Sequence, residues 1–347
     1  VNGLLRDLAV FYDVCLHDEK YEEKIENFDL DFTNKACKDC PTISFMKIDI
    51  ENNEIQPYKD ELKDYFNDLD VNKNNFFTDV SNYVSYETGQ PTHCYDASKI
   101  EGKLSLNYVD GINNFETLLG KKIDLKGKNL VFSCKDQIIN LAGVIGGKHT
   151  SCSVDTSSVI IECAYFKPEA IIGKSLKYDI RSEAAHKFER NTDRECHELV
   201  LRRFLKIVLK HSKVKKIEMV SYNYLKFNKN IIPINIDLIN KIIGIKISKE
   251  EYTKHLSKLG FILTNDGIEV PSCRNDIRTQ NDIAEEIARI IGYENIPLTE
   301  LNIKNYEQKN SSNNEYKIKR LLIDNGFHEV INNPFVKNSC KNAIQVD

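Results

Sequence analysis

Four acidic side chains near the end of the sequence form its sharpest candidate for chemistry. Asp282, Glu285 and Glu286 have the spacing i, i+3 and i+4, so in a helix their carboxylates share one face. Asp276 lies just upstream, where the chain would enter that helix. Carboxylates this close repel one another unless a cation lies among them, and Mg²⁺ binds a few carboxylates plus water. On spacing alone, a solvated acidic face at a helix N-terminus is the simpler explanation.

Glu162 and His93 are the next candidates. Glu162 lies inside an apolar run, Val159 to Phe166, where a carboxylate must find a hydrogen-bond partner or face solvent. Strand alternation favours the two orientations about equally, and a buried Glu162 would be a receptor for a ligand hydroxyl. His93 follows a turn-rich segment in which polar residues often have a function, although a lone loop histidine is usually only solvated.

Two further patterns are less specific. The Gly-Gly-Lys sequence at 146–148 is not a phosphate-binding P-loop, because Ala142 stands where its first glycine belongs. The glycine pair indicates either close backbone approach to a ligand or a turn. Cys37 and Cys40 are the only close pair among 10 cysteines, and no second pair follows at zinc-ribbon spacing. Reduced cytosolic thiols are the favoured interpretation, and metal or redox work by this pair is the alternative.

The composition limits the class of protein. The 347 residues are 41% hydrophobic and 29% charged, which supplies sizeable cores and excludes a wholly disordered chain. The length suggests two or three domains. The formal net charge of −4 excludes a basic nucleic-acid coat over the whole surface, although not a local basic face. No apolar stretch reaches membrane-spanning length and no signal-peptide pattern opens the chain, so we expect a soluble, cytoplasmic protein.

The elements that must position these residues alternate between strands and helices. After an opening helix, the sequence pattern predicts strands at 43–50, 104–109, 130–134, 138–144, 159–163 and 214–222, and helices at 167–176 and 181–212. A polar stretch at 226–230 marks a domain boundary. Beyond it we expect a short strand at 234–236, a helix from 237, a helix with the capping box Ser248–Glu251, a hairpin at 261–270 and a helix at 281–291. The fold class is therefore α+β with more than one domain.

Several ordered motifs resemble the bacterial β subunit of phenylalanyl-tRNA synthetase. They are Gly-Gln-Pro-Thr-His at 89–93, Leu-Ala-Gly-Val-Ile-Gly-Gly at 141–147, Ile-Glu-Cys-Ala-Tyr-Phe at 161–166, Arg-Ser-Glu-Ala-Ala-His-Lys-Phe-Glu-Arg at 181–190, Pro-Ser-Cys-Arg-Asn-Asp-Ile at 271–277, Asp-Ile-Ala-Glu-Glu-Ile at 282–287 and Ile-Gly-Tyr-Glu-Asn-Ile-Pro at 291–297. The likeness runs from the opening helix to the end of the chain. Several motifs in one order at compatible spacing make it specific.

The resemblance implies a multidomain α+β architecture. Residues 1–78 look like a structural segment and the start of an editing module, and residues 79–224 look like the tRNA-editing domain. Residues 230–300 look like a small Mg²⁺-binding domain with a winged-helix-like, DNA-binding-like fold, and residues 306–347 like the start of a catalytic-like class II synthetase module. The family's N-terminal oligonucleotide-fold tRNA-binding domain, most of the catalytic-like module and the C-terminal anticodon-binding domain are not in this sequence, so the resemblance implies a fragment.

The resemblance also implies a function. The family joins phenylalanine to its tRNA in an ATP-dependent reaction as an α₂β₂ tetramer, and the β subunit hydrolyses tRNA mischarged with tyrosine. An apolar pocket for phenylalanine cannot strongly reject an analogue that adds a hydroxyl, so a second, hydroxyl-seeking site is useful. By resemblance, Glu162 matches the carboxylate that reads the tyrosine hydroxyl, and His93 the histidine near the tRNA 3′ end and the hydrolytic water. The substrate-binding positions implied in the same way are Ser81, Gly146, Gly147, Ser182 and Ala184.

The acidic set gains weight from the same resemblance. Asp276, Asp282, Glu285 and Glu286 match the family's four Mg²⁺ ligands, at a site shared with the α subunit. The expected partners are that α subunit and tRNA-Phe, with no membrane. ATP is used by the tetramer and is not bound by this chain, because the synthetic active site is expected in the α subunit.

The chain departs from the family pattern at several positions. Serine stands for threonine at 81 and 182, lysine for glutamate at 148, asparagine for glycine at 191, and cysteine for an aromatic residue at 273. Lys148 reverses a charge beside the glycine pair, which bears directly on editing. Two rivals to an editing subunit therefore stay open: a structural, RNA-docking subunit without editing, and an RNA- or DNA-binding adaptor that works through the helix-and-hairpin domain.

Overall fold

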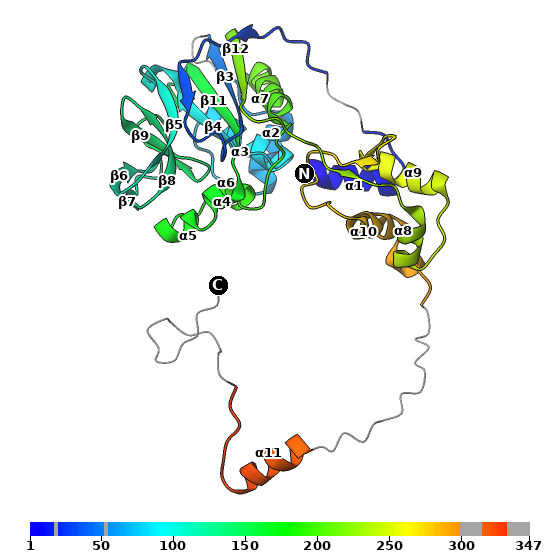
Figure 1. The fold of residues 1–347 in the computed structure, drawn as a ribbon. Coiled ribbons are helices and arrows are strands. Elements are labelled where there is room, and N and C mark those ends of the chain that lie inside the picture. Colours follow the sequence, from blue (N-terminus) through cyan, green and yellow to red (C-terminus); the bar gives the residue numbers. More distant parts are fainter. Residues whose placement is uncertain (17–19, 52–54, 299–313, 332–347) are drawn as a thin grey trace. The chain divides into compact units, whose positions relative to one another are not determined.

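The computed structural model describes residues 1–16, 20–51, 55–298 and 314–331. The chain divides into two compact units, Val1–Pro297 and Leu298–Asp347 (Figure 1). Among the helices of the described residues, none has the length and apolar character that crossing a membrane requires. The nine cysteines in the described ranges are all free thiols, and Cys340 lies outside these ranges.

A five-stranded sheet forms the centre of the larger unit. Its strand order is β1-β12-β3-β11-β4. The strands are β1 (Glu26–Asn27), β12 (Val214–Asn223), β3 (Thr42–Ile50), β11 (Ser158–Tyr165) and β4 (Thr92–Asp96). The long strand β3 pairs antiparallel with both β11 and β12, whereas β1 joins β12 in parallel. Residues far apart in the sequence therefore form one sheet.

Each face of this central sheet packs against a separate hydrophobic core. On β3, Ile43 and Phe45 point into one core while Met46, Ile48 and Ile50 point into the other, as strand alternation requires. The second core is closed by helices α2 (Asp60–Asp68), α3 (Phe76–Thr88) and α7 (His197–His211), which lie along one side of the sheet in Figure 1.

A second five-stranded sheet covers the first core. Its order is β10-β9-β8-β5-β2, with β10 (Ile145–Gly146), β9 (Gln137–Leu141), β8 (Asn129–Cys134), β5 (Leu104–Val109) and β2 (Phe32–Asn34). A two-stranded hairpin, β6 (Ile112–Glu116) and β7 (Lys122–Lys126), lies beside it. Short helices complete this side: η1 (Ala97–Lys99), α4 (Pro168–Ile171), α5 (Lys174–Tyr178) and α6 (Glu183–Phe188). Between these two sheets lies the core that receives Tyr95, Phe132 and Phe166.

The last part of the larger unit has its own small core. It contains α8 (Ile236–Ile243), α9 (Lys249–Lys258), α10 (Gln280–Ile291), η2 (Tyr293–Asn295) and a three-stranded sheet in the order β13 (Ile231–Ile232), β15 (Ile268–Glu269), β14 (Ile262–Leu263). The opening helix α1 (Asn2–Phe11) adds Val10 to this core. Two ion pairs, Asp7–Arg289 and Asp13–Lys258, further tie the N-terminal segment to it. In the second compact unit the structure describes one helix, α11 (Asn314–Asp324), which has no buried residue.

The sequence pattern predicted many of these elements, and the α+β class is confirmed. The capping box Ser248–Glu251 is present at the start of α9. Two predicted helices are wrong in extent, because the chain breaks each of them. The segment 167–176 divides at Gly173, and 181–212 divides around Asn191; both residues have positive φ, at 77° and 72°. The predicted strand at 234–236 is displaced to β13, and His93 lies in β4 rather than in a loop.

Candidate functional site

Glu162 and His93 meet on neighbouring strands of the central sheet. They are direct partners in the antiparallel register of β11 and β4. Alternation places both on the face that looks into the core between the two sheets, together with Ile160, Ala164 and Tyr95. Glu162 is only 5% exposed, so the open question of its orientation is answered: its carboxyl group points inward.

The Glu162 carboxyl group is held by a short chain of hydrogen bonds. The Tyr95 hydroxyl donates to Glu162 Oε2 at 2.7 Å, and Asn140 Nδ2 donates to the Tyr95 hydroxyl at 2.8 Å. Burial raises the pKa of Glu162 to about 8, and the hydrogen bond from Tyr95 partly opposes that rise. The site therefore contains a carboxyl group that is largely protonated at neutral pH and whose position is fixed by a neighbouring phenol.

His93 lies against the same phenol. The rings of His93 and Tyr95 meet edge to face, with their centroids 4.5 Å apart. Burial lowers the pKa of His93 to about 4, so the imidazole is neutral at pH 7. Within the part of the chain that the structure describes, buried Nε2 of His93 has no hydrogen-bond partner. A buried polar atom without a partner is costly, and it marks a place where a water molecule or ligand would be bound.

The glycine pair permits two close backbone approaches at this site. A Cβ atom on Gly146 would lie 2.1 Å from Cε1 of His93. A Cβ atom on Gly147 would lie 2.7 Å from the carbonyl oxygen of Ile139 and 3.0 Å from Cε2 of Phe115. Neither position can carry a side chain without moving its neighbours. Close approach, rather than a simple turn, is therefore the reason for these two glycines.

The three remaining predicted pocket residues surround the same strands. The Ser81 hydroxyl donates to the carbonyl oxygen of Thr92 at 2.8 Å, which anchors α3 next to His93. The Ser182 hydroxyl caps α6 by accepting from Ala185 N, and it donates to the carbonyl oxygen of Val144. Ala184 packs against the core between the sheets. The structure thus brings Ser182, Ala184 and the glycine pair to the same side of the central sheet as Glu162 and His93, whereas Ser81 lies on α3 over the opposite face. Both serine hydroxyls donate to the backbone.

Two departures from the family pattern have structural explanations. Lys148 Nζ forms a 2.8 Å ion pair with Glu116 on β6, so its charge has a partner outside the glycine pair. Asn191 has φ of 72°, a left-handed conformation that asparagine tolerates better than most residues.

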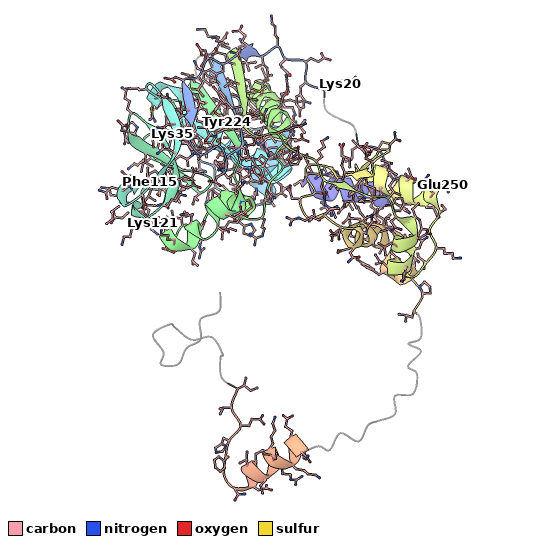
Figure 2. All side chains as sticks on the ribbon, in the orientation of Figure 1. Lys20, Lys35, Phe115, Lys121, Tyr224 and Glu250 are labelled. Atoms are coloured by element: carbon pink, nitrogen blue, oxygen red, sulfur yellow. The ribbon has the colours of Figure 1, made fainter. Side chains whose placement is uncertain are left out.

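A hollow of about 500 Å³ on the β6–β7 hairpin adjoins the site. Phe115 and Lys122 are among its lining residues, and Phe115 is the side chain that a Cβ on Gly147 would touch. Phe115 and Lys121, both labelled in Figure 2, come from this hairpin and its turn. Leu118 N donates to the carbonyl oxygen of Gly146 at 2.9 Å, so the hairpin turn is bonded directly to the glycine pair.

Three of the four predicted Mg²⁺ ligands, Asp276, Asp282 and Glu286, have other partners. The Arg274 guanidinium donates to both carboxylate oxygens of Asp276 and to both of Glu286, at 2.7–2.9 Å. Arg289 adds a 2.8 Å bond to Glu286. Although burial favours its neutral form, these arginine bonds hold the pKa of Glu286 below its usual range. The buried Glu286 is therefore ionised and neutralised by arginine.

The other two acidic residues do not complete a metal site. Asp282 accepts from the backbone N–H groups of Arg278 and Thr279 and forms the capping box of α10, while Glu285 is exposed. Among the residues that the structure describes, no group of three or more His, Cys, Asp or Glu side chains is arranged to hold a metal ion. This arrangement does not fit Mg²⁺, because the Arg274 guanidinium already binds Asp276 and Glu286. The Mg²⁺ site stays a prediction.

Sequence reasoning missed three residues that the geometry makes important. Tyr95 and Asn140 fix the Glu162 carboxyl group, and Arg274 binds two of the carboxylates proposed as metal ligands. A signal for Tyr95 was present, because it follows His93 by two residues and in a strand would share its face. Nothing in the sequence pattern indicates Asn140, since its role depends on the pairing of the two sheets.

Family models match most of the larger unit. A model described as the B3/4 domain matches residues 40–213, about half of the chain, and one described as the tRNA synthetase B5 domain matches residues 232–293. The B3/4 match includes both strands that carry Glu162 and His93, and the B5 match includes all four predicted metal ligands and Arg274.

Curated relatives agree with these matches. A phenylalanine–tRNA ligase beta subunit of Rickettsia felis is 31% identical over 97% of this chain and 45% of its own length. That of Ehrlichia canis is 34% identical over 78% of this chain and 35% of its own length. The chain thus spans less than half of the length of these relatives. Among solved structures, an N-terminal fragment of the phenylalanyl-tRNA synthetase beta-subunit from Pyrococcus horikoshii aligns with a TM-score of 0.39 and 12% identity, over 79% of this chain and 78% of that chain.

Proposed function

Because the chain belongs to the B3/4 domain family, in the group of phenylalanine–tRNA ligase beta subunits, we propose that it acts as such a subunit and hydrolyses tRNA-Phe mischarged with tyrosine. The observation that carries this proposal is the inward-facing carboxyl group of Glu162 beside the unpartnered Nε2 of His93. A hydroxyl receptor and a water-binding nitrogen are the two features that such an editing site needs.

Glu162 supplies the selectivity in this proposal. A buried carboxyl group with a free oxygen rewards a ligand that brings a hydroxyl, and offers nothing to the phenylalanine ring. Tyr95 uses Oε2, which leaves Oε1 for the phenol of a bound tyrosine. The discrimination that one such hydrogen bond provides is about 1.5–3 kcal/mol, or roughly 10- to 150-fold in rate.

His93 supplies the position of the attacking water. In the hydrolysis, water adds to the ester carbonyl carbon, the bond to the ribose oxygen breaks, and tyrosine and free tRNA are released. The pKa of His93, about 4, makes the imidazole a weak proton acceptor at pH 7. Its role is therefore to accept a hydrogen bond at Nε2 and orient the water, while Gly146 lets the imidazole ring occupy its position.

The proposal extends to the complete enzyme. We expect an alpha subunit as partner in an α₂β₂ tetramer, tRNA-Phe as substrate, and a cytoplasmic location. ATP and Mg²⁺ belong to the synthetic reaction of that assembly, with the metal shared between subunits. No step in this chain is assigned to either of them, because Arg274 holds Asp276 and Glu286 here.

One observation favours the rival function of a structural, RNA-docking subunit without editing. Glu162 already accepts a hydrogen bond from Tyr95, and the hydroxyls of Ser81 and Ser182 are bonded to backbone carbonyls. A substrate must therefore enter a site whose polar groups, His93 Nε2 excepted, are largely satisfied. Hydrolysis by the wild-type chain decides between the two functions. The adaptor that works through the helix-and-hairpin domain gains no comparable support.

The test is hydrolysis of Tyr-tRNA-Phe by the full chain and by the assembled enzyme. We expect the wild type to release tyrosine, Glu162→Gln to be at least 10-fold slower, and His93→Ala to be slower still, with Phe-tRNA-Phe cleaved slowly by all three. Tyr86→Phe, at an exposed position on α3, is the matched control and should match the wild type. If the wild type and both site variants are equally inactive in either form, the editing function is wrong and the docking function stands.

A further inference from the structure

Asn140 lies opposite the site on the second sheet, and its side chain reaches across the core to Tyr95. In the antiparallel register of β10 and β9, Asn140 is the partner of Gly146, the glycine that leaves room for the His93 ring. Asn140 is buried, and its Nδ2 atom donates to the Tyr95 hydroxyl at 2.8 Å. The amide and the phenol therefore form a hydrogen-bonded link between the two sheets, next to Glu162.

The direction of each hydrogen bond in this link follows from the chemistry of its groups. An amide nitrogen only donates, so the Tyr95 oxygen accepts from Asn140. The phenol has a single proton, and it is donated to Glu162 Oε2 at 2.7 Å. Oε2 is therefore an acceptor, and a proton carried by the carboxyl group of Glu162 has its place on Oε1.

The surroundings of Glu162 favour the protonated carboxyl group at neutral pH. Within the part of the chain that the structure describes, no ion pair joins this buried group to a cation, and burial raises its pKa to about 8. The titratable groups near it are His93 and Tyr95 on β4 and Cys40 before β3. All three are uncharged at pH 7, because burial lowers the pKa of the imidazole to about 4 and raises the pKa of the phenol and of the thiol. The protonated Oε1 is then a hydrogen-bond donor.

We propose that Asn140 and Tyr95 are specificity-determining residues that fix Glu162 as a hydrogen-bond donor toward the ligand, so that the site selects aminoacyl groups whose aromatic ring carries an oxygen acceptor. The proposal rests on the proposed function, since it takes an aminoacyl ester to be the ligand. A tyrosyl group has such an acceptor in its phenol oxygen, whereas a phenylalanyl group has none.

An aromatic amine separates this proposal from recognition by a carboxylate. Its N–H groups donate readily, but its nitrogen accepts poorly because the lone pair is delocalised into the ring. An ionised Glu162 would accept from the amine and bind it well. A protonated Glu162 that is held as a donor by Asn140 and Tyr95 finds no good acceptor in the amine, and should bind it no better than an unsubstituted ring.

Binding of three small amides to the full chain, measured by NMR titration, tests the inference. They are L-tyrosinamide, L-phenylalaninamide and 4-amino-L-phenylalaninamide. At pH 7 the wild type should bind L-tyrosinamide about 10-fold more tightly than either of the others. At pH 9, where Glu162 is ionised, the aromatic amine should gain about 10-fold over L-phenylalaninamide, because the carboxylate accepts from its N–H. Comparison with L-phenylalaninamide at each pH cancels the titration of the α-amino group that all three share.

Three variants test the two residues. Tyr95→Phe removes the hydroxyl and keeps the ring beside His93, and at pH 7 it should reduce the preference for L-tyrosinamide over the aromatic amine to within about 3-fold. Asn140→Leu should change the preference in the same direction. The double variant should go no further than Tyr95→Phe alone, because Asn140 acts through Tyr95. Tyr108→Phe, which removes a phenol bonded to Asp39 at 2.8 Å, is the matched control and should keep the wild-type preferences. Thermal unfolding, measured in parallel, verifies that each variant is folded.

The outcomes separate this inference from the proposed function. Wild-type preferences in both Tyr95→Phe and Asn140→Leu would overturn the inference, while hydrolysis of Tyr-tRNA-Phe by the wild type would still support the editing function. Tighter binding of the aromatic amine than of L-tyrosinamide at pH 7 would also overturn it, and so would equal or absent binding of all three amides by the wild type. The expected preferences without hydrolysis of Tyr-tRNA-Phe would support the donor role of Glu162 while rejecting the editing function.

Discussion

Glu162 is a carboxyl group inserted between two sheets, and its titration is coupled to folding. Burial raises its pKa from 4.5 to about 8. Between these values the folded protein retains a proton that the unfolded chain has released. The raised pKa therefore makes its full contribution to the free energy of unfolding below pH 4.5. This contribution declines as pH rises toward 8, by at most about 1.4 kcal/mol per pH unit for one proton.

Replacing Glu162→Gln should remove this dependence. The amide keeps an oxygen that accepts from the Tyr95 hydroxyl, but it does not titrate. We expect the free energy of unfolding, measured with urea between pH 5 and 8, to fall more steeply with pH for the wild type than for the variant. Parallel curves for the two proteins would show that Glu162 is already ionised in the fold at pH 5.

Gly146 sets the space next to His93. In Gly146→Ala the new methyl group would overlap the imidazole ring, which is itself packed against Tyr95, so the ring must move. We expect a loss of about 1–3 kcal/mol in unfolding free energy, typical of overpacking, together with loss of Tyr-tRNA-Phe hydrolysis. Gly3→Ala in α1, where the nearest atom is 3.9 Å from the added Cβ, is the control and should not destabilise the protein. Equal stability of the two variants would contradict the close approach.

At the residue scale, the sequence pattern indicated which residues form the site, but it did not indicate what surrounds them. It indicated that Glu162 was anomalous, yet alternation alone could not decide between core and solvent. That choice depends on elements distant in the sequence, because the second sheet and the helices α2, α3 and α7 bury both faces of the central sheet. Tyr95 and Asn140 were out of reach for the same reason, because the hydrogen bonds to Glu162 exist only once the two sheets are stacked.

Arg274 organises the entrance to α10. Its guanidinium binds Asp276 and the buried Glu286 in two bidentate pairs, and Arg289 continues this network to Asp7 on α1. An arginine that joins a loop to a helix in this way fixes both, and it lowers the repulsion among the acidic residues without a metal.

Removing this arginine should loosen one element rather than the whole unit. We expect Arg274→Gln to lower the protection of α10 amides in hydrogen exchange by about 1.5–3 kcal/mol, the usual contribution of charge-assisted bonds. Arg278→Gln, at an exposed position in the same loop, is the control. Millimolar Mg²⁺ should leave the wild-type protection unchanged. A Mg²⁺-dependent increase that disappears in Asp276→Asn would instead establish the four-carboxylate metal site.

At the element scale, the strands β3 and β5 were the most predictable part of the fold. The predicted strand at 104–109 has the observed bounds of β5, and 43–50 differs from β3 by one residue. The breaks at Gly173 and Asn191 were not predicted, because positive φ values depend on the packing of the flanking helices rather than on periodicity. Helix α2 was missed because a mainly polar segment hides the two residues that it buries, Leu62 and Phe66. Helix α3 buries residues around most of its circumference, among them Phe77, Val80 and Val84, and so lacks a clear polar face.

The larger unit should be independent of the segment that follows it. All three hydrophobic cores lie within Val1–Pro297, whereas α11 contributes no buried residue. A chain that ends at Pro297 should therefore keep the midpoint of thermal unfolding and the Tyr-tRNA-Phe hydrolysis of the full chain. A chain that ends at Thr279 loses Ile283 and Ile287 from the third core and serves as the destabilised control. A lower midpoint for the 297-residue chain would show that residues beyond it stabilise the unit.

The pairing of β3 with β12 also determines when this unit can fold during synthesis. Ser44 and Ser221, whose hydroxyls hydrogen-bond across these two strands, are 177 residues apart. At 5–20 residues per second, a ribosome needs about 9–35 s to make the intervening chain. During that interval the apolar faces of β3 and its hydrogen-bonding edge toward β12 lack their final neighbour. The central sheet of the nascent chain therefore stays incomplete until β12 has been synthesised. Substitutions in β12 should reduce the yield of soluble protein more than equally buried substitutions in α9, which forms locally.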